Sequence, residues 1–388
     1  MTTLSLCMIV KNESQNLPRC LESVKDFVNE IVIIDTGSED DTVEIAQSYG
    51  AKIDRFDWCN DFAAARNYSL SKATSEWILV LDADQELVVD SMNSPARSET
   101  LRNRIETDLK LNPQISAYLI PEIDMSQENL TPLRVVRLFR NHRNIQYVGR
   151  FHEVVDVDCD RMALLENVRV LHYGHTSEAV EQKNASRNIP LLEQLRQEEE
   201  LSLKLLSCLA GMYETTQQPE KAEDCYREAF ERLLPHFLEG SVPDDVSYVP
   251  QLMFNLGVKM LAQPEQDFEA LNLLCLKGIK WFPDFPPLVY LVGAVLRAMG
   301  FPLGATAYFD RCLNLGRDSL QDASHRTYSQ DHPFDRRYTT TYAAYDLGNA
   351  YYEAGDLQAA IAAFEQTLSF DNLFSPAQAR LRELTTLD

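Results

Sequence analysis

Two aspartates separated by one residue, Asp82 and Asp84, carry the clearest chemical signal in the sequence. They end an apolar run, WILVL, which predicts a buried β-strand. Residues two apart in extended chain project to the same side, so the two carboxylates can share one target. Carboxylate oxygens suit hard divalent cations, and such a cation can also bridge a diphosphate. The alternative is a solvated acidic turn after a strand.

Three other polar clusters accompany this pair within residues 1–90. They are Lys11-Asn12-Glu13, Asp35 with the Thr-Gly-Ser that follows it, and Asp61 with Arg66-Asn67 just beyond. Ligands of an open parallel sheet bind beyond the carboxyl ends of its strands, and three of the four clusters fall at such ends. We therefore expect one crevice lined by these side chains, in which carboxylates suit sugar hydroxyls and arginine suits phosphate. In the plainer alternative, Asp35 only terminates a strand and Arg66 is a surface charge.

The elements that must position these residues alternate along the first part of the chain. The pattern predicts strands over 4–10, 30–35, 52–55 and 77–82, and helices over 17–24, 40–49 and 62–72. Such alternation is typical of a mostly parallel sheet. Residues 117–172 contain several β-like runs and few helical patterns, so they predict an antiparallel or mixed extension of that sheet.

From about Ser177 to the end the pattern is wholly helical and repetitive. Three copies share a small residue in a first helix and an aromatic residue at the same offset in a second, and a weaker copy begins at Leu256-Gly257. The three pairs are Ala210 with Tyr226, Gly293 with Phe309, and Gly348 with Phe364. This pattern resembles the tetratricopeptide repeat, a helix–turn–helix unit.

Composition narrows the class of protein further. The net charge of −23 argues against duplex nucleic acid as a partner, because phosphate binding needs a basic footprint. No apolar stretch approaches the ~18 residues of a transmembrane segment, and the first residues lack the basic start of a signal peptide. The eight cysteines form no C-x-x-C pair, so we expect reduced thiols, no zinc site and a cytoplasmic protein.

The segments LCMIVKNE, IVIIDTGSEDDT, DFAAARN and WILVLDAD resemble, in order and spacing, the successive motifs of family 2 glycosyltransferases. The resemblance covers roughly residues 1–175. It implies an α/β fold, a Rossmann-like mixed sheet of the GT-A type that binds a nucleotide-sugar, over residues 1–176. An all-α domain with tetratricopeptide-like repeats follows over 177–388. The implied activity is metal-dependent transfer of a sugar, with inversion, from a nucleotide-sugar such as a UDP-sugar, with Mn²⁺ or Mg²⁺ as cofactor.

The resemblance also implies which residues meet the donor. Asp35 corresponds to the acid that meets the ribose hydroxyls, with Glu13 beside it near the nucleoside. Asp61 corresponds to the acid that recognises the base edge, and Arg66 to the cation near the diphosphate. The match of Asp35 and Asp61 to uridine-binding acids is what favours UDP.

The implied metal ligands are the aspartate pair and a late histidine. Asp84 is the direct ligand, and Asp82 lies closer to both ribose and metal. His172 is favoured slightly over His175 as the third ligand, with His152 as a further candidate. Ordinary packing or capping is the alternative for any of these histidines.

The implied catalytic base is Glu153, in the run Gly149-Arg150-Phe151-His152-Glu153, because related sequences show a similar His-Glu after a glycine. An inverting transfer needs such a base to take the proton of the acceptor. A structural ion pair of Glu153 with an arginine is the alternative, and Asp156 and Asp158 are the next candidates. One of the arginines at 134, 137, 140 and 143 could touch the diphosphate, and the sequence does not say which.

Two other functions remain open at this stage. One is a non-catalytic nucleotide-binding scaffold whose repeats bind a protein partner. The other is a nucleotidyltransferase, which would need a glycine-rich basic loop where this chain has Lys11-Asn12-Glu13-Ser14. The acceptor is unknown, and because repeat solenoids present a long concave surface, we expect a protein or peptide acceptor or a protein partner.

Overall fold

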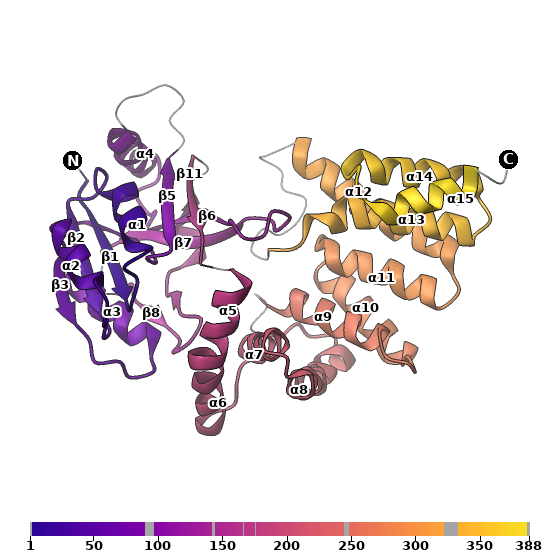
Figure 1. Ribbon diagram of the computed structural model, residues 1–388, viewed down its shortest axis with the longest axis horizontal. Coiled ribbons are helices and arrows are strands. Elements are labelled where there is room, and N and C mark those ends of the chain that lie inside the picture. Colours follow the sequence, from indigo (N-terminus) through magenta and orange to yellow (C-terminus); the bar gives the residue numbers. More distant parts are fainter. Residues whose placement is uncertain are drawn as a thin grey trace. The chain divides into compact units, whose positions relative to one another are not determined.

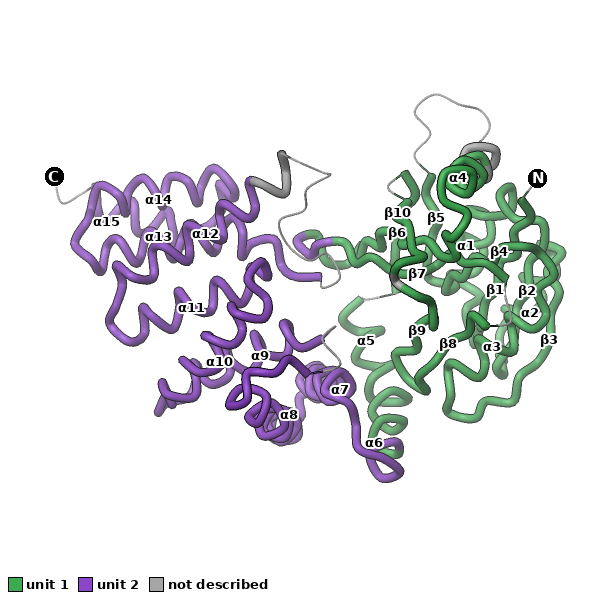
Figure 2. The backbone as a smooth tube through the Cα atoms, turned by 180° about the vertical axis from the view of Figure 1, so that it is seen from behind, with its two compact units in different colours: residues 1–128, 132–194 green, residues 129–131, 195–388 purple. Residues whose placement is uncertain are grey.

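A computed structural model of the chain describes residues 2–89, 97–141, 144–165, 167–174, 176–243, 248–321 and 333–385. The chain forms two compact units, shown in different colours in Figure 2. The first contains residues 1–128 and 132–194, and the second contains residues 129–131 and 195–388. The predicted fold class, an α/β sheet domain followed by a helical repeat domain, is confirmed. No helix in the described ranges is long and apolar enough to cross a membrane.

The first unit is built on one mixed sheet (Figure 1). Its strands follow the order β3-β2-β1-β4-β7-β6-β11-β5, with β10 paired to β6. Strands β3, β2, β1 and β4 run parallel, while β7 is antiparallel to both of its neighbours. The bounds are β1 Leu4–Val10, β2 Glu30–Asp35, β3 Lys52–Arg55, β4 Trp77–Val80, β5 Gln85–Val89, β6 Ala117–Asp124, β7 Leu133–Arg140, β10 Met162–Leu164 and β11 Val168–His172.

Helices cover both faces of this sheet because side chains alternate along each strand. Leu6 and Met8 of β1 join a core with helices α1 (Leu17–Val24), α2 (Thr42–Ser48) and α4 (Arg97–Leu111). Cys7 lies on the opposite face, in a core with Phe139 and helix α3 (Phe62–Lys72). The sheet is therefore held rigidly from two sides, and its carboxyl edge is left for the polar loops.

Two further features complete this unit. A short two-stranded ribbon pairs β8 (Tyr147–Val148) with β9 (Val154–Val155). After β11 the chain turns into helix α5 (Ser177–Lys183), a π-helical stretch (Asn184–Asn188) and helix α6 (Ile189–Glu198). Residues 177–194 belong to the first unit, so the units divide after Gln194, later than the 176/177 boundary that the sequence suggests. The cause is physical, since Lys183 and Gln194 bond to Asp84 and Asn60 of the sheet domain.

The second unit consists of helix pairs. The close approach of paired helices depends on small residues: a Cβ on Gly293 or Gly348 would lie 2.8 or 2.6 Å from the ring of Phe309 or Phe364. This contact explains why the sequence repeats a small residue and an aromatic residue at one offset. The helices are α7 Leu203–Thr215, α8 Pro219–Glu239, α9 Val249–Leu261, α10 Phe268–Trp281, α11 Pro286–Ala298, α12 Pro302–Gln321, α13 Thr341–Glu353, α14 Leu357–Phe370 and α15 Ser375–Thr385.

Candidate active site

The loops after β1 and β2 are tied together at the carboxyl edge of the sheet. The backbone N–H groups of Asn12 and Glu13 donate to the hydroxyls of Ser38 (3.0 Å) and Thr42 (2.7 Å). The N–H of Ser14 donates to Asp40 at 3.1 Å. Side chains of the second loop thus fix the backbone of the first. Ser38, Asp40 and Thr42 therefore carry the hydroxyl and carboxylate oxygens that accept these hydrogen bonds.

Asp35 and Asp61 are each held by their own loop. The carboxylate of Asp35 accepts hydrogen bonds from the N–H groups of Gly37 (3.2 Å) and Ser38 (3.0 Å), and the glycine permits the φ of 108° that this turn needs. The carboxylate of Asp61 accepts from the N–H of Ala64 at 2.9 Å and caps the N-terminus of α3. Both carboxylates thus stabilise their own loops. Their binding to the ribose and to the nucleobase of a donor remains a prediction.

The negative charges of Asp82 and Asp84 affect the pKa of the Glu13 carboxyl. Burial raises the pKa of its carboxyl, the hydrogen bond from Asn16 opposes this rise, and the negative charges of Asp84 and Asp82 add to it. The amide of Asn16 donates to Glu13 at 2.9 Å. The β1 loop therefore lies at the same edge of the sheet as the loop after β4, because β1 and β4 are parallel neighbours.

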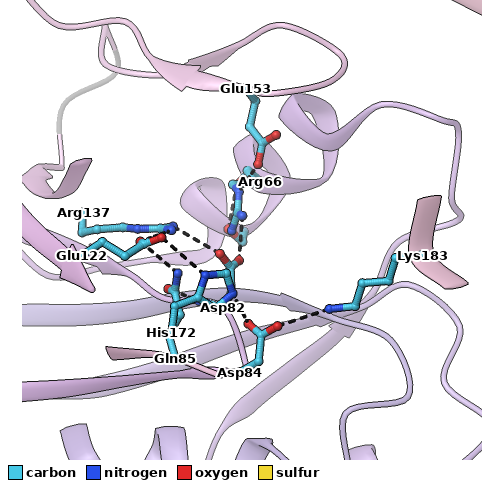
Figure 3. A network of polar contacts seen from close by, with 10 residues as sticks. Arg66, Asp82, Asp84, Gln85, Glu122, Arg137, Glu153, His172 and Lys183 are labelled. Atoms are coloured by element: carbon cyan, nitrogen blue, oxygen red, sulfur yellow. Dashed lines mark hydrogen bonds and ion pairs between the residues drawn. The ribbon is translucent and has the colours of Figure 1, made fainter. Parts of the chain in front are cut away.

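The aspartate pair follows β4 directly and is surrounded by cations (Figure 3). The carboxylate of Asp82 contacts Nη2 of Arg66 at 2.7 Å and Nη1 of Arg137 at 3.3 Å. That of Asp84 contacts Nε2 of His172 at 3.3 Å and Nζ of Lys183 at 3.2 Å. Burial alone would raise the pKa of Asp82, but the two arginines hold it well below its usual range.

These contacts extend into one chain of alternating charge. Arg66 also donates from Nε to Glu153 at 2.7 Å, and Arg137 donates from Nη2 to Glu122 at 2.9 Å. Glu122 lies 3.5 Å from Nδ1 of His172, which closes the connection to Asp84. Each buried charge is thereby offset by a neighbour of opposite sign, as burial requires. In order, the chain runs Glu153, Arg66, Asp82, Arg137, Glu122, His172, Asp84 and Lys183.

His172 occupies the middle of this chain between two carboxylates. Although burial alone would lower the pKa of its imidazole, hydrogen bonds and charge from Asp84 and Glu122 raise it to about 10. The pKa of Glu122 is in turn about 2, because Arg137 and His172 outweigh its burial. The strand pairing places this histidine: His172 of β11 lies opposite Gln85 of β5, the residue after Asp84.

The segment around Glu153 is held against α3. The side-chain amide of Asn67 donates to the carbonyl of Tyr147 (2.9 Å) and accepts from its N–H (2.8 Å). The N–H of Phe62 donates to the carbonyl of Arg150 at 3.0 Å. These bonds bring Glu153 to Arg66. The predicted base is therefore in the site, and it is also in the ion pair with an arginine that the sequence left as the alternative.

Three non-glycine residues near these loops have positive φ: Asn12 (56°), Asn60 (59°) and His152 (52°). Such conformations are costly and concentrate at functional sites, where the surrounding structure enforces them. His152 packs its ring against Phe151 at 4.8 Å. The candidate His175 lies outside the described residues.

The donor atoms at the aspartate pair fit a divalent cation of a particular kind. The described ranges contain no cluster of three or more His, Cys, Asp or Glu side chains arranged as a ready-made metal site. Mg²⁺ in particular is commonly held by one or two carboxylates together with phosphate oxygens of a substrate. Asp82 and Asp84 supply that protein share. Nη1 of Arg66 is buried and meets no acceptor within the described part of the chain, so it offers a donor for phosphate.

Comparison with known sequences decides the family of this unit. The model of the family described as Glycosyl transferase family 2 matches residues 5–92, which contain β1 to β5. The chain carries a family 2 glycosyltransferase domain. The model of the Tetratricopeptide repeat matches residues 341–372, which contain α13 and α14. Both resemblances seen in the sequence are confirmed.

Individual relatives agree with these two matches. A TPR repeat-containing protein of Synechococcus elongatus is 36% identical over 201 residues, 49% of this chain and 46% of that protein. The glycosyltransferase SunS of Bacillus subtilis is 31% identical over 198 residues, 50% of this chain and 45% of that protein. The chain thus spans about half the length of these curated relatives.

Among solved structures, residues 1–349 of Staphylococcus aureus TarS match 72% of this chain and 88% of theirs, at 14% identity and a TM-score of 0.33. A likeness this distant carries no information on substrate.

Sequence reasoning missed two members of the charge chain, Glu122 and Lys183, and did not single out Arg137. Glu122 lies in the second half of β6, and Arg137 is one of three arginines in β7, so neither stands out by type or spacing. Lys183 is the last residue of α5 and gives no signal in the sequence, because its contact with Asp84 depends on how the chain turns after β11. Of the four arginines the sequence could not separate, Arg143 lies outside the described residues, and among the other three Arg137 is the one that contacts Asp82.

Asp156 and Asp158, the further base candidates, lie elsewhere. They line a separate cavity of about 280 Å³ with Arg140 and Arg161. Arg140 pairs with Trp77, the first residue of β4, whereas Asp82 lies two residues beyond the last residue of that strand. The cavity is therefore at the opposite edge of the sheet, out of reach of chemistry at the aspartate pair.

Proposed function

We propose that the glycosyltransferase domain transfers a sugar from a nucleotide-sugar donor to an acceptor at the crevice around Asp82 and Asp84. The observation that carries this proposal is the chain of alternating charge centred on that pair. It holds four carboxylates and their cations at the carboxyl edge of parallel strands, where open α/β sheets bind ligands.

The donor is proposed to be a UDP-sugar. This rests on the motifs of Asp35 and Asp61, which match the uridine-binding acids of the family. Glu13 adds a carboxylate on the same side of the crevice, and the buried Nη1 of Arg66 is available to a phosphate oxygen. A bound Mn²⁺ or Mg²⁺ would be held by Asp82 and Asp84 and would offset the charge of the departing diphosphate. His172, the third ligand that the sequence suggests, has its two ring nitrogens on Asp84 and Glu122, and in that state it would hold the Asp84 carboxylate in place instead of binding the metal.

Glu153 is the proposed base. Its Oε1 accepts from Arg66, and its Oε2 accepts no hydrogen bond within the described residues, so one oxygen is available to an acceptor hydroxyl or thiol. Arg66 would thus orient the base with one side of its guanidinium and contact Asp82 with the other. Transfer with inversion is the stereochemical outcome that the family resemblance implies.

The repeat unit is proposed to recognise a protein or peptide, as the acceptor or as a separate partner. The match to the tetratricopeptide repeat over 341–372 supports this, since helical repeats commonly present an extended concave surface. The absence of paired cysteine spacings in the sequence supports a cytoplasmic location.

Hydrolysis of donor tests the activity before any acceptor is known. Purified protein is incubated with UDP-, GDP- and ADP-sugars, with Mn²⁺ or with a chelator, and the released nucleotide diphosphate is measured. We expect slow hydrolysis of one or more UDP-sugars that needs the metal. Failure to bind or hydrolyse any nucleotide-sugar would instead favour a protein whose repeats act alone.

A further inference from the structure

Lys183 differs from the other cations of the charge chain. Its side chain is 41% exposed, whereas those of Arg66 and Arg137 are 9% and 13% exposed. Each arginine contacts two carboxylates, but Lys183 contacts only Asp84 among the described residues. It is therefore the cation that is held most weakly. Its four-carbon stem also lets the ammonium group move without moving the backbone.

The backbone that follows Lys183 is unusual. Lys183 ends α5, and the chain continues as a π-helical stretch over Asn184–Asn188. The side-chain amide of Asn188 donates to that of Asn184 at 2.9 Å, and both residues are buried. π-Helical turns are uncommon and are found frequently at functional sites. Lys183, the residue before this stretch, extends to Asp84 (Figure 3).

The two oxygens of Asp84 are both in contact with cations. Oδ1 contacts His172 and Oδ2 contacts Lys183. A divalent cation bound to this carboxylate would lie beside two groups of positive charge, so its binding favours the departure of one of the two. His172 is buried and also held by Glu122, whereas Lys183 is half-exposed and has no second carboxylate among the residues described. Lys183 is therefore the group that can leave.

We propose that Lys183 is the exchangeable cation of the donor site, neutralising Asp84 in the donor-free protein and moving to the diphosphate when a divalent cation takes its place. This inference rests on the proposed function. Lys183 is near the place where the nucleotide is expected, because its positive charge lowers the pKa of Glu13 in the β1 loop. An ammonium group suits a phosphate oxygen as a compact point charge.

The proposal predicts opposite effects of one substitution on two binding constants. Lys183→Met removes a competitor for Asp84, so Mn²⁺ alone should bind about 2- to 5-fold more tightly, which is the scale of one partly exposed ion pair. The same variant lacks a phosphate ligand, so UDP at saturating Mn²⁺ should bind roughly 10-fold more weakly. Lys183→Gln should behave in the same way, and Lys183→Arg should retain UDP binding.

Calorimetry with Mn²⁺ alone, and then with UDP at saturating Mn²⁺, measures both constants. Lys52→Met is the matched control: Lys52 is 60% exposed and contacts Glu30, 9% exposed, at 2.6 Å, at the other edge of the same sheet. It should change neither constant. Thermal unfolding of each variant confirms that the fold is retained.

Lys183 variants whose two constants both stay within about twofold of the parent would overturn the proposal, as would weaker Mn²⁺ binding. If the parent protein itself binds neither Mn²⁺ nor UDP, the proposed function fails, and this inference fails with it. If the parent binds both and the Lys183 variants do not differ, only the role of Lys183 is lost.

Discussion

Gly174 offers a perturbation of the site that removes no functional group. It lies two residues after β11, where the N–H of Tyr173 donates to the carbonyl of Asp84 at 3.0 Å. A Cβ at Gly174 would lie 1.8 Å from Oδ2, 2.6 Å from Cγ and 3.2 Å from Cβ of Asp84. Its φ is outside the left-handed region, so an alanine is compatible with the backbone. The whole effect of Gly174→Ala should therefore be displacement of the Asp84 carboxylate.

The size of the effect follows from the distances. Ordinary contact with a Cβ begins near 3.4 Å, so Oδ2 must move by about 1.6 Å from its place 1.8 Å away. The contacts of Asp84 with His172 (3.3 Å) and Lys183 (3.2 Å) cannot survive such a shift. A misplacement of about 1 Å in an active site can cost roughly 100-fold in rate, or about 2.7 kcal/mol. We expect kcat/KM for donor hydrolysis to fall by about that factor.

Steady-state hydrolysis of the UDP-sugar and thermal unfolding together check this prediction. The control is Gly211→Ala in α7, where an added Cβ meets nothing within 4 Å. It should leave the kinetics unchanged and stabilise the helix by about 1 kcal/mol. If Gly174→Ala retains kcat/KM within about threefold of the parent protein, then Asp84 in its observed position is not needed and the metal assignment loses its basis.

Three other predictions concern the base, the repeats and acid stability. Glu153→Gln keeps an acceptor for Arg66 but loses the charge, so turnover should drop roughly 100-fold while UDP affinity changes little; a drop below about fivefold would place the base elsewhere. A chain ending at Glu200, beyond α6, should still hydrolyse donor and lose transfer to a protein acceptor, whereas loss of donor binding as well would make the repeats structural. Glu30 is half-buried, which alone would raise its pKa, yet hydrogen bonds from Lys52, Ser5 and Thr74 hold that pKa at about 2 against an ordinary 4.5. The stability it contributes is therefore present above about pH 4.5 and lost as pH falls toward 2, so Glu30→Gln should flatten the decline of Tm with acid, and an unchanged slope would contradict this.

Local patterns predicted the elements that carry the motifs. The predicted bounds of β1, β2, β3, α1 and α3 match the structure at both ends. The predicted helix over 40–49 begins only at Thr42, because the side chain of Asp40 accepts from the N–H of Thr42 and holds the chain in a turn. The predicted strand over 77–82 ends at Val80, since Gln85 accepts from the N–H of Asp82 and starts a turn there.

Long-range pairing lay beyond what local patterns can indicate. The run IQYVGR at residues 145–150 predicts a strand, but only Tyr147–Val148 are paired as one. The side chain of Asn67 bonds to the backbone N–H and carbonyl of Tyr147, and Gly149 turns the chain with a φ of 95°. The motif residues Asp82, Asp84 and Arg66 were identifiable by type and spacing. Their partners Glu122 and Lys183 were not, since those contacts arise only when β6 and α5 reach the site.

The central claim is that Asp82 and Asp84 form a metal-dependent site for a nucleotide diphosphate. The most direct test is calorimetric titration of UDP into the parent protein and into Asp84→Asn, each with Mn²⁺ and with a chelator. Asparagine keeps the size of the side chain, removes its charge and retains an oxygen that can accept from His172 or Lys183, so the fold should persist. The account predicts UDP binding by the parent protein with Mn²⁺ only, and its loss in Asp84→Asn. Binding that is equal with the chelator, or equal in the variant, would contradict it.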